Sequence, residues 1–243
     1  MTHSSSPAVV VDDVSVADRG EVVLDRVRLS VASGSVFGIL GRGRAPGVFL
    51  ECLAGARRPT SGRVTILGLD ARSRLRLRSS RLFLPRGRER DLSRRSPRVL
   101  LLEDPEPSAD ALAGRLRELA ARGTAVVFSS PRARLAEDAA DRVALLVRGR
   151  VLAEGSPREL VTRFRRIRYA NSRTETRTDF GNELDEFQAV RVRVRGWGIE
   201  AVVSDFDEAA FDRFCRIDGV EDAKAERVSL EEILEAVGGE RGE

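Results

Sequence analysis

The sequence predicts an α/β protein: a parallel sheet flanked by helices, with an antiparallel β part at the N-terminus and a small α+β domain at the C-terminus. Three observations support this class. Residues 35–164 alternate between short apolar runs and segments with helical spacing, as parallel strands joined by helices do. Residues 99–102 are continuously apolar, which is typical of a strand buried on both faces. After Phe164 this alternation stops, and a smaller pattern begins near residue 188.

The N-terminal part predicts a disordered tail over residues 1–7 and two strands over 8–16 and 21–34. Both strand segments are rich in valine, and a turn with the sequence Asp-Arg-Gly separates them at residues 18–20. We therefore expect them to pair as antiparallel neighbours.

The central part predicts the alternating elements of the parallel sheet. Strands are expected at 35–40, 62–70, 99–104, 124–130 and 142–147, with 150–155 as the hairpin partner of the last. Helices are expected at 45–62, 108–123, 132–140 and 156–164. Pro46 suits the first turn of its helix and Gly123 suits a helix end.

Residues 71–98 differ from the rest, because eleven arginines face only two acidic residues, Glu89 and Asp91, and no helical period is evident. The run invites the hypothesis of an anion-binding surface for nucleic acid or an acidic membrane. Phe83 is its single aromatic residue, which disfavours nucleic acid because bases need stacking partners. A shortened, solvated linker is the preferred interpretation.

The C-terminal part predicts a linker over 165–187 and a small α+β domain over 188–243. Strands are expected at 190–196, 199–206 and 220–228, and helices at 207–217 and 229–239. Ser229 and Glu232 have the spacing of a capping box at the start of the last helix.

The composition excludes several classes of protein. No apolar run approaches the roughly 20 residues that span a bilayer, and the N-terminus lacks the pattern of a signal peptide. We therefore expect a cytoplasmic protein. One histidine, His3, and two distant cysteines, Cys52 and Cys215, predict no metal site. Lys224 is the only lysine, so every other positive side chain at neutral pH is arginine.

Four stretches, in order, resemble the ATP-binding subunit of an ABC transporter. They are LDRVRLSVASGSVFGILG (24–41), CLAGARRPTSGRVTILGLD (52–70), VLLLEDPEPSAD (99–110) and ADRVALLVRGRVLAEGSPREL (140–160). The resemblance covers about residues 8–164 and implies a P-loop NTPase-like fold. Residues 220–239 are similar to the small C-terminal domain of subunits that serve ABC-2-type exporters. The family's helical subdomain would be reduced here to about residues 86–97, with residues 91–95 as the remnant of its signature motif.

The resemblance implies a nucleotide loop after residue 40, and a working loop needs the pattern G-x-x-x-x-G-K-[ST]. The implied nucleotide positions are Gly41, Arg42, Gly43, Arg44, Gly47, Val48 and Phe49. Gly47 stands in the place of the lysine, and Val48 and Phe49 stand in the places of the hydroxyl residues. Pro46 also removes a backbone N–H donor. Arg42 and Arg44 either replace the lost charge or are solvated loop arginines, and we favour the second hypothesis.

The resemblance also implies two catalytic positions, Glu103 and Asp104, at the end of the apolar strand. The family has Asp then Glu there, so the two side-chain lengths are exchanged, which would misplace both carboxylates. Pro131 stands where the family has a γ-phosphate-sensing histidine, and Asp110 matches the aspartate of the D-loop.

The sequence leaves enzymatic activity open and supports several hypotheses about function. The preferred one is a non-hydrolysing pseudo-ATPase that is a structural or regulatory partner of a multi-span ABC-2-type permease or of an intact sister ATPase. Homo- or heterodimers and peripheral association with the inner face of the cell membrane, through that partner, would follow. A divergent active ATPase and an arginine-rich anion-binding module are the alternatives, and a decaying gene without function is a fourth. The residues assign no cofactor, and the resemblance alone implies ATP and Mg²⁺.

Overall fold

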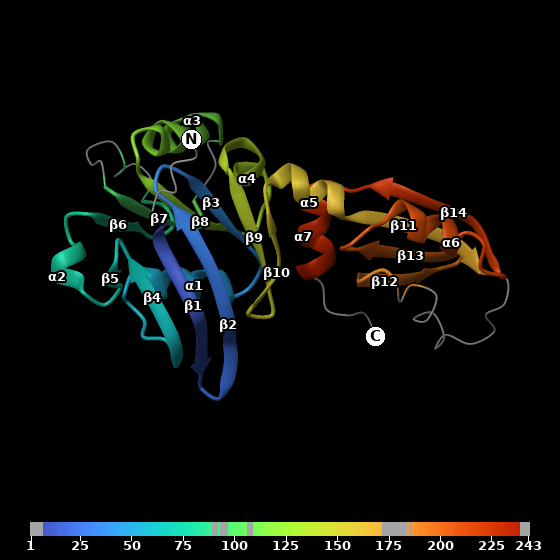
Figure 1. Ribbon diagram of the computed structural model, residues 1–243, viewed down its shortest axis with the longest axis horizontal. Coiled ribbons are helices and arrows are strands. Elements are labelled where there is room, and N and C mark those ends of the chain that lie inside the picture. Colours follow the sequence, from blue (N-terminus) through green and yellow to red (C-terminus); the bar gives the residue numbers. More distant parts are fainter. Residues whose placement is uncertain are drawn as a thin grey trace. The chain divides into compact units, whose positions relative to one another are not determined.

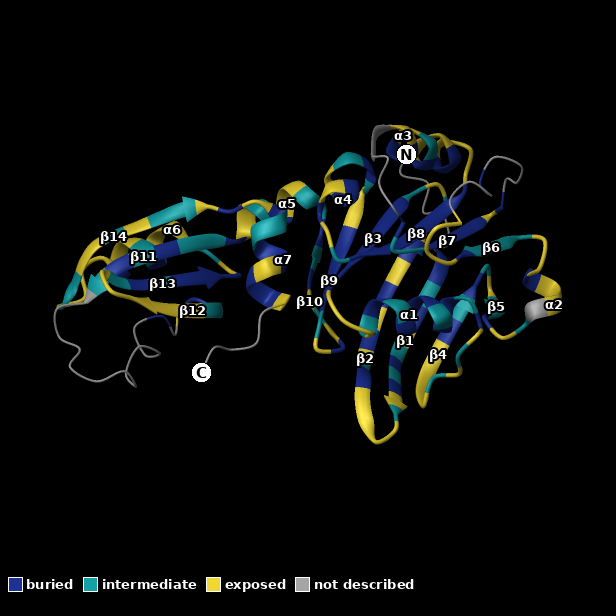
Figure 2. Cartoon of the chain, turned by 180° about the vertical axis from the view of Figure 1, so that it is seen from behind, coloured by how far each residue is buried: buried dark blue, intermediate teal, exposed yellow. Residues whose placement is uncertain are grey.

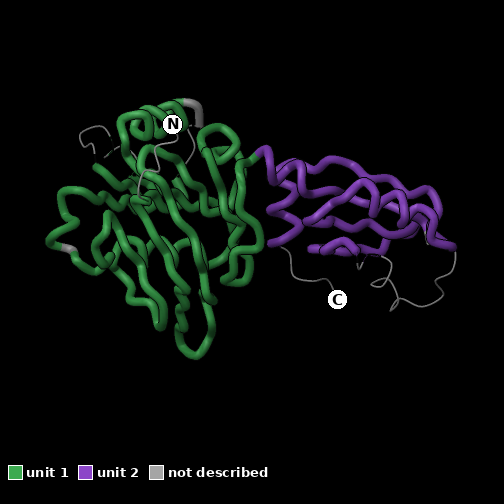
Figure 3. Tube along the Cα trace, viewed as in Figure 1, with its two compact units in different colours: residues 1–157 green, residues 158–243 purple. Residues whose placement is uncertain are grey.

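The computed structural model describes residues 7–88, 92, 97–105, 109–171, 184 and 186–238, with Arg74, Ala109, Asp110 and Asn171 described by their backbone only. The chain forms two compact units, residues 1–157 and 158–243 (Figure 3). Most of the predicted tail, residues 1–6, and most of the predicted subdomain remnant, residues 89–91 and 93–96, lie outside the described residues. Pro7, which was assigned to the tail, is instead the first residue of a strand.

Unit 1 contains two sheets (Figure 1). The antiparallel sheet has the order β2-β1-β4-β5. Its strands are β1 (Pro7–Asp18), β2 (Glu21–Ala32), β4 (Ser61–Ile66) and β5 (Leu69–Asp70). Valine and leucine side chains alternate along β1 and β2 and bury one face, as the period-2 pattern of the sequence predicts.

The second sheet has the order β10-β9-β3-β8-β7-β6, and only the β9–β10 pair is antiparallel. Its strands are β3 (Val36–Leu40), β6 (Arg81–Leu84), β7 (Val99–Glu103), β8 (Ala125–Ser130), β9 (Arg142–Val147) and β10 (Arg150–Gly155). The central strands are almost entirely buried (Figure 2), which explains their continuous apolar sequence. The predicted fold class is confirmed.

Three helices cover this sheet. Helix α1 (Ala45–Leu53) packs against strands of both sheets, and its buried side chains join a core that includes Phe37, Leu101 and Val127. Helices α3 (Ala109–Ala121) and α4 (Arg134–Ala139) contact each other and β3, and α3 also contacts β8. This arrangement places the N-terminus of α1 directly after β3, where parallel-sheet proteins form ligand sites.

Several elements differ from the prediction. The helix expected over 45–62 ends at Leu53. Residues 71–98, for which no regular structure was expected, contain the short helix α2 (Arg74–Leu77) and the edge strand β6. Arg81 of β6 donates hydrogen bonds to the backbone carbonyls of Leu53 and Ala71, so this arginine is part of the fold rather than of a solvated linker.

Unit 2 has one antiparallel sheet with the order β12-β13-β11-β14 and three helices. Its strands are β11 (Arg165–Asn171), β12 (Ala189–Arg195), β13 (Gly198–Val203) and β14 (Val220–Arg227). Its helices are α5 (Pro157–Arg163), α6 (Glu208–Phe214) and α7 (Leu230–Gly238). The assignment of residues 165–187 to a linker is wrong for 165–171, because β11 pairs with both β13 and β14. Residues 172–183 lie outside the described residues.

The core of unit 2 and its last helix follow from simple sequence features. Tyr169 of β11 packs edge-on against Phe214 of α6, with ring centroids 4.9 Å apart. The predicted capping box is confirmed: the Ser229 N–H donates to the Glu232 carboxylate (2.8 Å), and the Glu232 N–H donates to the Ser229 Oγ (3.2 Å).

Among the described residues, no helix has both the length and the apolar character needed to cross a bilayer. Nor do these residues contain a group of three or more His, Cys, Asp or Glu side chains arranged to hold a metal ion.

Candidate functional site

A cavity of about 630 Å³ lies at the carboxyl ends of β3, β7 and β8, where α1 begins. The predicted loop residues that line it are Gly41, Gly43, Arg44, Gly47 and Val48. Both predicted catalytic residues, Glu103 and Asp104, also line it. The fold therefore brings the two motifs together, although they are far apart in the sequence.

Gly41 is required by a close approach of two backbone segments. Its N–H donates to the carbonyl of Ser130 (3.2 Å). A Cβ at this position would lie 2.4 Å from the carbonyl oxygen of Leu146, a distance that Cβ atoms do not reach. Gly43 has φ +76°, in the left-handed region that favours glycine. The glycines at 41 and 43 thus shape the turn between β3 and α1.

Gly47 lies against the carboxylate of Glu103. A Cβ at Gly47 would lie 2.9 Å from the Glu103 Oε1 atom. This carboxylate is half-buried and has neither a hydrogen bond nor an ion pair with any residue that the structure describes. A negative charge that no described residue pairs with therefore lies beside the loop position at which the family has a lysine.

The two positions after Gly47 belong to the hydrophobic core. Val48 is 6% exposed and Phe49 is fully buried, in the same cluster as Cys52 and Leu53. Pro46 in the first turn of α1 has no N–H to offer a ligand. The start of α1 thus presents fewer donors than an ordinary helix N-terminus.

Asp104 is held by the protein's own cations. Its carboxylate forms ion pairs with Arg86 (3.3 Å) and, at longer range, with Arg132 (3.9 Å). Its N–H donates to the Ser129 Oγ (3.2 Å), and its φ of +35° marks a tight turn at the end of β7. One oxygen, Oδ1, is buried without a hydrogen-bond partner among the described residues. Two guanidinium groups of the chain therefore neutralise this carboxylate.

The loop arginines have different surroundings. The Arg44 guanidinium forms ion pairs with Asp18 and Glu21, the residues on either side of the β1–β2 turn. Arg42 is exposed and does not line the cavity. The side chain of Asp110, the predicted D-loop residue, lies outside the described part of the chain.

Sequence reasoning did not identify four of the charged and polar residues at the cavity. Glu51 and Arg57 form an ion pair there (2.6 Å), and Arg86 and Ser129 contact Asp104. Arg86 follows the strand β6, which the sequence did not predict, so no signal connected it with Asp104. The short apolar run Leu-Phe-Leu at 82–84, directly after Arg81, is the feature that could have revealed that strand.

The chain is similar in sequence to curated ATP-binding proteins of ABC transporters, although no protein-family model matches it. The Nod factor export ATP-binding protein I of Mesorhizobium japonicum is 25% identical, over 65% of this chain and 66% of that protein. The methionine import ATP-binding protein MetN of Chlamydia pneumoniae is 38% identical over a shorter stretch, 29% of this chain and 21% of that protein. The chain thus spans less than two thirds of the length of each of these relatives.

Solved structures of ABC ATPase domains share the fold. The ATP-binding subunit of an ABC transporter superposes with a TM-score of 0.55 at 18% identity, covering 64% of this chain and 92% of that one. The protein cbiO1 of Clostridium perfringens, part of the ABC transporter complex cbiONQ, gives 0.56 at 15% identity, with coverages of 64% and 91%. At these identities the likeness establishes the fold alone.

Proposed function

Because the chain has the fold of an ABC transporter nucleotide-binding domain and is related in sequence to ABC ATP-binding proteins, we propose that it is an ATP-binding-subunit-like protein that does not hydrolyse ATP. In this role it keeps the scaffold of the family and acts as a structural or regulatory partner. The observation that carries the proposal is the Glu103 carboxylate, which lies beside Gly47 and has no ion pair with a described residue.

The loop and the strand end together oppose the binding of a polyphosphate. In a working loop a lysine neutralises the phosphate oxygens, whereas here the Glu103 carboxylate lies next to that position. Two like charges a few ångströms apart in a partly desolvated cavity repel each other. Arg44, the nearest loop arginine, is paired with Asp18 and Glu21, so it would have to break those ion pairs to neutralise a phosphate.

The residues present do not fit the Mg²⁺ ion that the fold family implies. The hydroxyl ligand is replaced by Val48, a core residue with no oxygen on its side chain. Of the two carboxylates at the strand end, Glu103 lies against Gly47, and Asp104 already has Arg86 and Arg132 as positive neighbours. A metal ion would have to displace or face these guanidinium groups, so we derive no catalytic step through Mg²⁺.

Calorimetric titration with ATP, with and without Mg²⁺, tests the proposal. We expect no binding tighter than about 100 μM, which corresponds to about −5.5 kcal/mol. Phosphate release should stay at the level of a buffer control. Tighter binding, or turnover that is lost in both Glu103→Ala and Asp104→Ala, would instead support the divergent ATPase.

The partner that we propose is a multi-span permease of the ABC-2 type or an intact sister ATPase, met at the cytoplasmic face of the membrane. Support comes from the relationship to export ATP-binding proteins and from the preserved sheet and α1. Co-expression with a permease gene next to this one, followed by co-purification from detergent, tests the pairing. Substitution of the loop lysine of the sister subunit should then abolish the ATPase activity of the assembly, which would support the regulatory role. If no stable complex forms, the pairing is contradicted.

A further inference from the structure

A second cavity, of about 220 Å³, lies in unit 1 between the end of α1, strand β4 and the segment after β5. Four arginines line this arginine pocket, namely Arg57, Arg58, Arg63 and Arg72. Asp70 is the only carboxylate among the described residues that line it. The pocket therefore carries an excess of positive charge, and it is separate from the cavity at Glu103 except that Arg57 borders both.

The four arginines differ in how far the protein neutralises them. Arg57 forms an ion pair with Glu51 (2.6 Å). Arg72 binds Asp70 through two guanidinium nitrogens (3.0 and 2.9 Å), and this contact lowers the pKa of the Asp70 carboxyl far below its usual range. Arg58 and Arg63 form no hydrogen bond or ion pair with any residue that the structure describes. Two guanidinium groups of the pocket are thus available to an external anion.

The rest of the lining contributes two hydroxyl groups and two buried core residues. The Thr60 Oγ1 accepts a hydrogen bond from the Ala17 N–H (2.9 Å), which leaves the hydroxyl proton free to be donated. Ser61 contributes a second hydroxyl to the lining. Cys52 and Val64 are buried below these groups and are held in the core of unit 1.

We propose that the arginine pocket binds a small phosphate-bearing anion. Guanidinium groups match the geometry and charge of phosphate oxygens, and hydroxyl donors complete such a site. The pocket is smaller than the roughly 300–1,000 Å³ typical of sites that enclose a whole drug-sized ligand. It therefore fits a phosphate or pyrophosphate group rather than a nucleotide, and this group can belong to a free metabolite or to a lipid headgroup.

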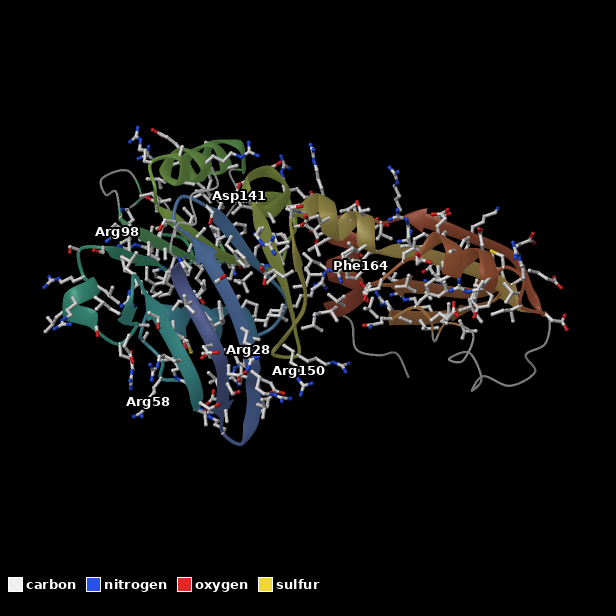
Figure 4. All side chains as sticks on the ribbon, in the orientation of Figure 1. Arg28, Arg58, Arg98, Asp141, Arg150 and Phe164 are labelled. Atoms are coloured by element: carbon white, nitrogen blue, oxygen red, sulfur yellow. The ribbon has the colours of Figure 1, made fainter. Side chains whose placement is uncertain are left out.

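Calorimetric titration of the full chain with inorganic phosphate and with pyrophosphate tests the proposal. We expect saturable binding within a titration range of up to about 10 mM. The double variant Arg58→Gln/Arg63→Gln should weaken it at least about tenfold, since it removes two charged donors to the phosphate oxygens. The matched control, Arg98→Gln/Arg117→Gln, removes the same charge from two exposed arginines outside the pocket. Figure 4 labels Arg58 and Arg98, which lie well apart in unit 1.

A third variant, Arg44→Gln/Arg86→Gln, distinguishes the two cavities, because both of its arginines line the cavity at Glu103 and neither lines the arginine pocket. No binding in the wild type, equal weakening in the Arg98/Arg117 control, or loss only in the Arg44/Arg86 variant would each overturn the proposal. None of these outcomes depends on whether ATP is hydrolysed. Circular dichroism of each variant confirms that the fold is intact before titration.

Sedimentation with vesicles identifies the source of the phosphate group. Binding to vesicles of phosphatidylglycerol but not to neutral phosphatidylcholine, lost in Arg58→Gln/Arg63→Gln, would assign the pocket to a lipid headgroup. Binding of free pyrophosphate without retention on either vesicle would assign it to a soluble anion. In either case the Arg58→Gln/Arg63→Gln variant should lose binding and the Arg98→Gln/Arg117→Gln control should keep it.

Discussion

Two glycines at the candidate site have opposite structural roles, and a pair of alanine substitutions separates them. Gly41 lies in the turn after β3, and Gly47 lies in the first turns of α1. We predict that Gly41→Ala destabilises the protein and that Gly47→Ala does not. The contrast tests whether Gly41 is required by the fold while Gly47 is not.

The contacts of the added methyl groups give the expected magnitudes. At Gly41 the Cβ would lie 2.4 Å from the Leu146 carbonyl oxygen and 3.2 Å from the Pro46 Cγ, and neither backbone nor ring can turn away. Such overpacking costs about 1–3 kcal/mol. At Gly47 the Cβ would meet only the end of the Glu103 side chain, at 2.9 Å, which can rotate. Alanine there gains up to about 1 kcal/mol of helix propensity.

Thermal unfolding followed by far-ultraviolet circular dichroism measures the difference. With about 2–4 °C of midpoint shift for each kcal/mol in a chain of this size, Gly41→Ala should lower the midpoint by roughly 2–12 °C. Gly47→Ala should leave it unchanged or raise it by up to about 4 °C. Hydrogen exchange in peptides that cover residues 36–53 then shows whether the loss is local to β3 and α1.

The background Glu103→Ala serves as the control for the second substitution. If movement of Glu103 limits the gain, Gly47→Ala should stabilise the Glu103→Ala protein more than the wild type. A Gly41→Ala protein as stable as the wild type, or a Gly47→Ala protein destabilised as much as Gly41→Ala, would refute the distinction.

Three further predictions follow from buried and paired groups. Phe49→Ser, which returns a hydroxyl to the loop, should lower the free energy of unfolding by about 3–5 kcal/mol in a urea titration, because Phe49 is fully buried. Hydrogen bonds from Ser229 and Arg166 lower the pKa of Glu232 to about 2. The stabilisation that Glu232 provides is therefore complete above pH 4.5 and is lost as the pH falls toward 2. In Glu232→Gln the free energy of unfolding, measured as a function of pH, should change less over that range. Burial raises the pKa of the Cys52 thiol to about 12, so a thiol reagent at pH 8 should modify Cys215 and spare Cys52 until urea unfolds the chain.

The sequence was sufficient for the main sheets because their patterns are local. Residues 99–102 are apolar without interruption, and the structure buries all of them in β7. The capping box at Ser229 was predicted for a similar reason, since both partners lie within one helical turn. Local patterns of this kind do not depend on which segment packs next to them.

Strand β6 was missed because its apolar run, residues 82–84, is short and lies among arginines, and β11 was missed because arginines hide its alternation. In β11 the buried residues Ile167 and Tyr169 alternate with Arg166 and Arg168, whose charges are paired with Glu200 across the sheet. A strand with one charged face looks like a polar linker when only its composition is considered. Its place between β13 and β14 depends on pairings that are distant in the sequence, and no local signal gives them.

The candidate site could be located from the sequence but not described in detail. The family resemblance placed the loop and Glu103 at one edge of a parallel sheet, and the structure brings them into one cavity. The contact between Glu103 and Gly47 and the ion pair of Arg86 with Asp104 depend on side-chain directions. Arg86 also comes from the connection after β6, so its position required a strand that the sequence did not predict.

The pairing of arginines connects the two proposals. Three arginines that line the first cavity are each paired with a carboxylate of the same chain: Arg44 with Asp18, Arg57 with Glu51 and Arg86 with Asp104. A phosphate entering there must compete with those carboxylates and also face Glu103, which has no compensating partner among the described residues. In the arginine pocket Arg58 and Arg63 form no ion pair with a described residue, and the one described carboxylate of the lining, Asp70, acts on Arg63 only at longer range because it is bound to Arg72. An arginine that exchanges its carboxylate partner for a phosphate gains little binding free energy. A guanidinium group without a partner gains a new charge-assisted hydrogen bond when it binds the phosphate. On this argument, anions should favour the arginine pocket over the cavity at Glu103, even though the latter is larger.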